Sequence, residues 1–79
     1  MIKAYILVKT RVGKLEEVLQ KAKELKNIES IAVVTGECDV IVKVKVKDME
    51  QLLELTDELQ TIEGIRQTTT HVVEKEITL

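Results

Sequence analysis

The sequence predicts an α+β fold in which a β–α–β unit occurs twice in succession. Two segments, residues 14–26 and 49–59, repeat their apolar residues at helical spacing. A third, residues 39–47, carries valine at every second position, which is the period of a β-strand. The remaining segments are short and rich in β-branched residues, as strands are. The predicted order of elements is therefore β–α–β–β–α–β.

The first unit begins with a strand at residues 2–9, which are apolar and rich in β-branched residues. Residues 10–13 interrupt this strand, and from Lys14 onward the spacing becomes helical. The helix places its apolar residues at i, i+3, i+4, i+7 and i+10, namely Leu15, Val18, Leu19, Ala22 and Leu25. Residues 26–27 close the helix, and residues 28–35 predict the second strand.

The second unit follows a turn at residues 36–39 and starts with the alternating strand at residues 39–47. Asp48 lies three residues before Gln51 and predicts a helix N-cap. The helix then repeats the spacing of the first one with Met49, Leu52, Leu53, Thr56 and Leu59. Residues 65–77 predict a long final strand.

This order of elements most simply gives a ferredoxin-like fold. Its four-stranded antiparallel sheet has the strand order 4-1-3-2, and both helices cover one face of the sheet. On the first strand, the side chains that we expect to meet the helices are Ile2, Ala4, Ile6 and Val8. The other face of the sheet stays uncovered.

The uncovered face carries Tyr5, Leu7 and Ile41, which form an apolar patch on a small protein. A patch of this kind usually marks an interface. We therefore expect a homodimer that packs open face to open face, as a dimeric α/β barrel or sandwich, with further assembly through the sheet edges. The alternative is that these residues are scattered exposed aliphatics, which every protein surface carries.

Length and composition limit what the chain can do. Its 79 residues correspond to one domain, residues 1–79, with no second catalytic or DNA-binding unit. A domain this small is marginal without a disulfide, a metal or a partner, and Cys38 is the only cysteine. Tyr5 is the only aromatic residue and the net charge is -2, so stacking on bases and direct nucleic-acid binding are disfavoured. A second copy of the chain is the expected source of extra stability.

Several classes of function are also disfavoured by what the sequence lacks. No apolar run approaches the ~20 residues of a membrane span, and no signal peptide is evident, so a cytoplasmic location is expected. A single cysteine and a single histidine, His71, give no metal site and no nucleophile with a base. The glycines form no phosphate-binding loop. We expect neither an enzyme nor a bound cofactor.

The turn at residues 36–39 is the most informative segment. It exposes backbone N–H groups around a glycine, and Asp39 adds a negative charge. In the predicted topology the final strand begins at the same end of the sheet, where Thr68, Thr69 and Thr70 offer hydroxyl groups. Together these groups suit the α-amino and α-carboxylate groups of a free amino acid. The alternative is an ordinary hairpin turn beside threonines that favour strands.

Three stretches resemble a known family. VTGECDVIVKVKVKDMEQL, IEGI and RQTTTHVVEKEI are similar to the effector-binding (RAM) domain of the Lrp/AsnC, or feast/famine, transcription regulators. The resemblance implies dimerisation through the sheets, larger ring assemblies, and amino-acid binding at interfaces between dimers. It assigns two groups of residues to the ligand site: Gly36, Glu37, Cys38 and Asp39 in the contacting loop, and the hydroxyls of Thr68 and Thr70.

The chain departs from the family in two respects. It starts at the first strand, without the helix-turn-helix domain of full-length members, and so resembles the stand-alone RAM proteins. Cys38 stands where the family often has an aromatic residue, which affects selection of the ligand's side chain. The ACT domain, another amino-acid-binding ferredoxin-like family, would predict a similar ligand, but the VTGECD turn fits the RAM pattern better.

The leading hypothesis is an oligomeric amino-acid sensor that modulates transcription, with a full-length Lrp/AsnC regulator as a candidate partner. A rival hypothesis is a structural partner that binds no ligand and co-oligomerises with a DNA-binding paralogue.

Overall fold

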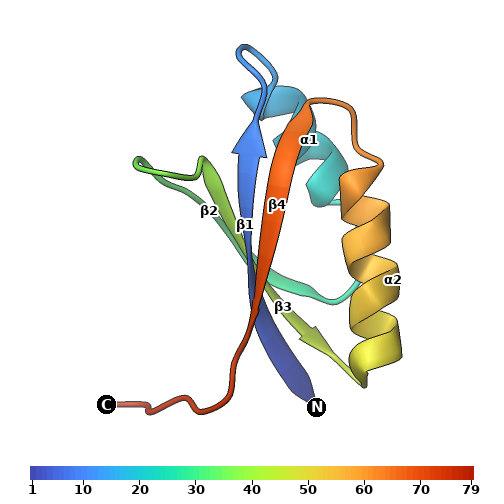
Figure 1. Cartoon of the computed structure of the whole chain (residues 1–79), viewed down its shortest axis with the longest axis vertical. Helices are drawn as coiled ribbons and strands as arrows, with labels where there is room; N and C mark the ends of the chain where they lie inside the picture. The colour runs from blue at the N-terminus through green and yellow to red at the C-terminus, as the bar shows by residue number, and fades with distance from the viewer.

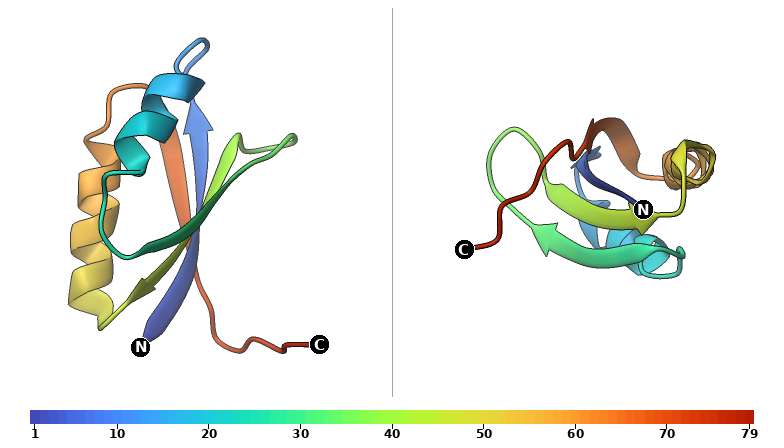
Figure 2. Two further views of the ribbon diagram at one scale, coloured as in Figure 1. Left: turned by 180° about the vertical axis from the view of Figure 1, so that it is seen from behind. Right: turned by 90° about the horizontal axis from the view of Figure 1, so that it is seen from below.

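The computed structural model describes all 79 residues and confirms the predicted order of elements. These elements are β1 (Ile2–Thr10), α1 (Leu15–Ala22), β2 (Ile28–Val33), β3 (Val40–Val46), α2 (Met49–Gln60) and β4 (Ile65–Val72). The strands form one antiparallel sheet in the order β2-β3-β1-β4, which is the predicted order read from the other edge. Figures 1 and 2 show both helices against one face of this sheet, so the fold is ferredoxin-like.

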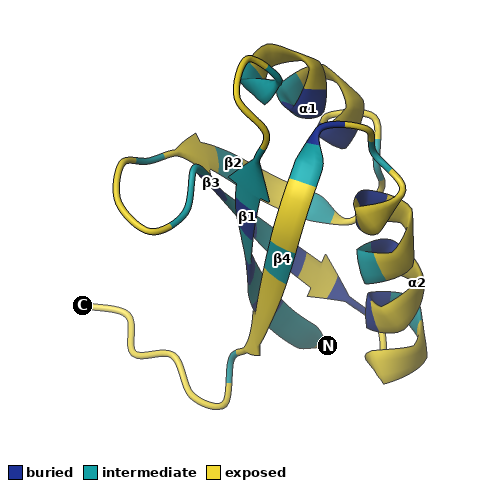
Figure 3. Cartoon of the chain, turned by 45° about the horizontal axis from the view of Figure 1, so that its top comes forward, coloured by how far each residue is buried: buried dark blue, intermediate teal, exposed yellow.

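The core lies between the two central strands and the helices. Ala4, Ile6 and Val8 of β1 are fully buried, as the alternation predicts. Their partners in the register are the buried valines of β3, Val44, Val42 and Val40. Figure 3 shows buried residues on the central strands and on the helix surfaces turned toward the sheet. Ile2 is only partly buried and packs at the border of this core.

The start of α2 follows the prediction. Asp48 accepts a hydrogen bond from the backbone N–H of Gln51 over 2.9 Å. In return the Gln51 side-chain oxygen accepts one from the backbone N–H of Lys47 over 2.7 Å. The first bond satisfies a backbone donor of the first helical turn, and the second fixes the residue before the N-cap to that turn.

The buried face of α2 differs from the prediction in part. Leu52, Leu55 and Leu59 are buried, whereas Met49 and Leu53 are 55% and 61% exposed. Neighbouring residues of a helix point about 100° apart, so Leu52 and Leu53 cannot both face the sheet. The spacing 52, 55, 59 is the one that places all its members in the core.

Three elements end earlier than predicted. β2 ends at Val33, α1 at Ala22 and β4 at Val72, where we expected residues 35, 25 and 77. β4 has only β1 as a neighbour, and the last bond between them runs from the backbone N–H of Val73 to the carbonyl of Lys3. Because β1 begins at Ile2, which this register places opposite residue 74, residues 75–77 have no strand left to pair with.

The C-terminal tail, residues 73–79, instead leaves the sheet on the side away from the helices (Figure 1). The Glu76 carboxylate accepts hydrogen bonds from Lys3 Nζ at 3.3 Å and Tyr5 OH at 3.2 Å, and lies 3.6 Å from Lys43 Nζ. Lys43 Nζ also lies 5.7 Å from the centre of the Tyr5 ring. The hydrogen bond from Lys3, then that from Tyr5 and the charge of Lys43, lower the pKa of Glu76. Glu76 thereby ties the tail to the open face.

The assignment of the buried helix face predicts a contrast between two leucines of α2. Leu59→Ala should lower the free energy of unfolding by about 2–5 kcal/mol, because it leaves a cavity in the core. Leu53→Ala should change it by less than about 0.5 kcal/mol, since Leu53 is exposed. Urea denaturation at one fixed protein concentration measures both changes. Equal losses in the two variants would contradict the assignment.

The Glu76 contacts predict that docking of the tail depends on pH. Because the pKa of Glu76 is lowered, its contacts stabilise the docked tail fully at pH values above ~4.3, the usual pKa of a glutamate. This stabilisation is lost as the pH falls through the lowered pKa of Glu76. Glu76→Gln should therefore speed hydrogen exchange of the Val73 amide at neutral pH. Glu74→Gln, in the same tail but outside these contacts, is the control. Unchanged protection of Val73 in the Glu76 variant would refute this role.

Candidate functional site

The turn between β2 and β3 is held at its base by backbone hydrogen bonds. The Val34 N–H donates to the Asp39 carbonyl, and the Asp39 N–H donates to the carbonyl of Val8 in β1, each over 2.9 Å. Gly36 has φ +130, a conformation that side-chain-bearing residues rarely adopt. A Cβ at Gly36 would meet no atom within 4 Å, so the glycine serves the backbone conformation and not close packing. The turn projects from the sheet on the side away from the helices (Figure 2).

The Asp39 carboxylate fixes the turn to the end of β1. Its Oδ2 accepts hydrogen bonds from the backbone N–H of Thr10 over 2.8 Å and from the Thr10 hydroxyl over 3.2 Å. Its second oxygen, Oδ1, accepts no hydrogen bond from the chain. Asp39 therefore has a structural role already, and one free carboxylate oxygen remains beside the turn. The sequence contains no local signal for this contact, because the two residues are 29 positions apart.

A cavity of about 210 Å³ lies between the turn and the open face of the sheet. Seven residues from three segments line this turn cavity: Leu7 and Lys9 of β1, Glu37 and Cys38 of the turn, and Gln67, Thr69 and His71 of β4. Leu7 pairs with Thr69 and Lys9 pairs with Gln67 across the two strands, so these side chains share one sheet face. The turn cavity thus collects polar groups over one aliphatic side chain.

The predicted threonines lie elsewhere. Thr68 pairs with the buried Val8 and Thr70 with the buried Ile6, which places both on the helix side of β4. Thr68 Oγ1 accepts a hydrogen bond from Gln60 Nε2 of α2 over 3.1 Å. The structure therefore brings Glu37 and Cys38 together with Thr69, and leaves Thr68 and Thr70 on the opposite face. The alternation of β4 was the signal that could have selected Thr69.

The predicted apolar patch is present on the open face. Tyr5, Leu7 and Ile41 are each partly buried in the single chain, and Leu7 is the direct register partner of Ile41. Leu7 also lines the turn cavity, and Tyr5 contacts Glu76 of the tail. The patch therefore lies between the turn cavity and the docked tail.

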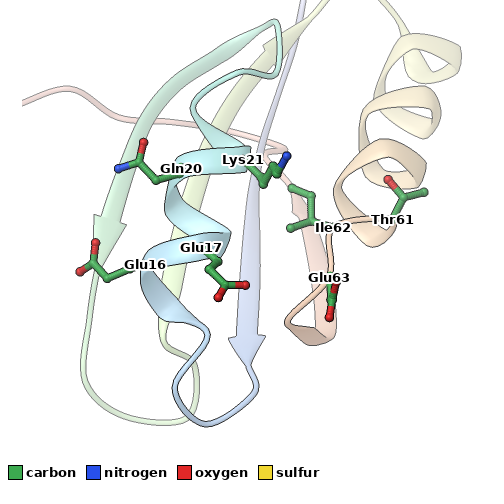
Figure 4. Close-up of a pocket in the computed structure, with 7 residues that line it drawn as sticks. All are labelled: Glu16, Glu17, Gln20, Lys21, Thr61, Ile62 and Glu63. Atoms are coloured by element: carbon green, nitrogen blue, oxygen red, sulfur yellow. The ribbon is translucent and has the colours of Figure 1, made fainter.

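A larger hollow of about 680 Å³ lies between α1 and the C-terminal end of α2 (Figure 4). Its side chains do not converge, because Glu16 and Gln20 point away from Lys21 and Ile62. Glu17, also in its lining, already lies 3.6 Å from Lys14. This hollow offers a small ligand fewer converging groups than the turn cavity does. No three metal-ligating side chains come together anywhere in the chain, and no helix is long and apolar enough to cross a membrane.

Comparison with known proteins identifies relatives over the whole chain. Residues 3–78 match the model of the Lrp/AsnC ligand binding domain. Among solved structures, TTHA0845 from Thermus thermophilus is 26% identical, with 100% of both chains covered and a TM-score of 0.92. The hypothetical protein PHS023 from Pyrococcus horikoshii is 32% identical, with 96% of this chain and 93% of that chain covered and a TM-score of 0.84.

A third structure is the transcriptional regulator NMB0573 from Neisseria meningitidis, solved as a complex with L-Met. It is 25% identical, with a TM-score of 0.90, and the match covers 99% of this chain but 53% of that chain. No curated protein matches the sequence. The family match covers nearly the entire chain, and the family is regulatory and not catalytic. This chain therefore belongs to the Lrp/AsnC ligand-binding domain family.

Proposed function

We propose that the chain is an amino-acid sensor that binds a free amino acid in the turn cavity and assembles through its open face. Domains of this family bind amino acids and form oligomers. The observation that carries the proposal is the turn cavity itself, where polar side chains from β1, the turn and β4 converge beside an apolar patch. A concave site with a few converging polar groups is typical of small-molecule binding.

The turn offers groups that can bind the α-carboxylate and α-amino groups, which all amino acids share. The backbone N–H groups of Gly36, Glu37 and Cys38 donate no backbone hydrogen bond and are available to a carboxylate. Glu37 lines the cavity, and Asp39 ends the turn with an oxygen, Oδ1, that accepts no hydrogen bond from the chain. We assign the contact with the ligand's ammonium group to these two carboxylates. The NMB0573 structure shows that one relative binds a free amino acid, L-Met.

Assembly and ligand binding share one side chain. Leu7 belongs both to the apolar patch and to the lining of the turn cavity, so a second copy on the patch also covers the cavity. A ligand that binds only the assembled form stabilises it by about 2.7 kcal/mol at a concentration 100 times its Kd. The amino acid would thereby control the oligomer, and co-assembly with a full-length Lrp/AsnC regulator would carry this signal to transcription.

The ammonium contact can be tested without breaking the turn. Asp39→Asn keeps an oxygen that accepts from Thr10 but removes the charge, whereas Asp39→Ala removes both. Calorimetric titration with the twenty amino acids should show binding to the wild-type protein. Asp39→Asn should weaken that binding by about 1.5–3 kcal/mol, or roughly one to two powers of ten in Kd.

Asp57→Asn on the exposed surface of α2 is the matched control and should bind like the wild type. If the wild-type protein bound no amino acid, the sensor proposal would be wrong. If the protein formed oligomers but bound no amino acid, the result would favour the hypothesis of a purely structural assembly partner.

The role of the open face predicts an effect on oligomeric state. Ile41→Asp puts an unpaired charge in the patch, and burial of that charge should reduce the wild-type oligomer to monomers. Leu53→Asp, on the exposed side of α2, should leave the oligomer intact. Sedimentation velocity measures the state, and circular dichroism confirms that both variants are folded. A folded Ile41→Asp variant with the wild-type assembly would exclude the patch as the interface.

A further inference from the structure

Four polar side chains line the turn cavity from the sheet, and three of them, Gln67, Thr69 and His71, are exposed. Lys9, Gln67, Thr69 and His71 all line the cavity from β1 and β4. None of these four side chains makes a hydrogen bond or an ion pair within the chain. Lysine only donates, while the amide, hydroxyl and imidazole groups can each supply a donor. By contrast, the hydroxyl of the neighbouring Thr68 already accepts a hydrogen bond from Gln60.

The cavity lining contains one acidic and one basic side chain. Glu37 belongs to the turn, where the ammonium group of the proposed ligand would lie, and Lys9 is the only lysine or arginine in the lining. Lys9 and Gln67 are register partners on the sheet floor. A ligand whose α-amino group lies at the turn would therefore extend its side chain over a floor rich in donors.

An aliphatic side chain fits this floor poorly. Leu7 is the only aliphatic residue in the lining, so a leucine or isoleucine side chain would find one apolar contact. It would also take Lys9 and Thr69 out of water without replacing their hydrogen bonds, which is unfavourable for polar and charged groups. A side chain that ends in an oxygen acceptor would satisfy the same groups.

We propose that the turn cavity selects amino acids whose side chain ends in a carboxylate or a carboxamide, namely aspartate, glutamate, asparagine and glutamine. This inference rests on the proposed function, since it specifies the ligand class of the same cavity. Lys9 and Thr69 are the residues that determine the specificity. Lys9 favours the two carboxylates over the two carboxamides, because a hydrogen bond between charged groups is the stronger one.

Calorimetric titration of the whole protein with these four amino acids and with leucine, isoleucine and methionine tests the inference. At least one of the four should bind about tenfold or more tightly than any of the three aliphatic ones. Thr69→Val and Lys9→Met should each weaken binding of the best ligand by about tenfold. Lys9→Met should weaken the binding of amino acids with a side-chain carboxylate more than the binding of those with a carboxamide. Thr70→Val, one position away on the opposite face of β4, should bind like the wild type.

The outcomes separate this inference from the proposed function. Tighter binding of an aliphatic amino acid, or full affinity in both the Thr69 and the Lys9 variants, would overturn the ligand class while the sensor proposal stands. If none of the seven amino acids bound, the ligand class would also be wrong. The sensor proposal would still stand in that case if another amino acid bound the protein and Asp39→Asn weakened its binding.

Discussion

The strict alternation of β1 between two faces of the sheet determines most of this structure. Ala4, Ile6 and Val8 face the helices and are fully buried. Tyr5 and Leu7 between them, and Lys9 after them, face outward. Because β1 is central in the sheet, its register also fixes which residues of β3 and β4 lie on each face. Shifting that register by one residue would exchange core and open face completely. The core and the proposed site are thus two consequences of one pattern.

The open face joins three features that are distant in the sequence. The turn cavity lies at one end, the apolar patch lies in the middle, and Glu76 of the tail binds Lys3, Tyr5 and Lys43 at the other end. A domain of 79 residues buries a smaller fraction of its surface than a larger one does, and the core of this chain is entirely aliphatic. Covering the patch with a second copy would add buried apolar area and close the turn cavity in the same step. In the proposed function, this shared surface would couple the ligand to assembly.

The fold was predictable from the sequence because local periodicity specifies it, and the site was predictable only in part. Valines 40 to 46 and the Asp48 cap carry their signals within a few residues, and both predictions are confirmed. The end of β4 at Val72 depends on where β1 begins, which is not a local property. Likewise, Asp39 meets Thr10 across 29 positions and Glu76 meets Lys3 across 73. Alternation within β4 separates Thr69 from Thr68 and Thr70, but which of the two faces each takes depends on the register between β1 and β4.

In the proposed function, a single face of the sheet carries both the assembly contact and the ligand. A crystal structure of the chain grown with a mixture of the twenty amino acids would reveal both contacts at once. We expect electron density for an amino acid in the cavity between Glu37 and Thr69, with a second copy packed on Tyr5, Leu7 and Ile41. A structure with these three residues open to solvent, or with the amino acid bound in the hollow between α1 and α2, would contradict it.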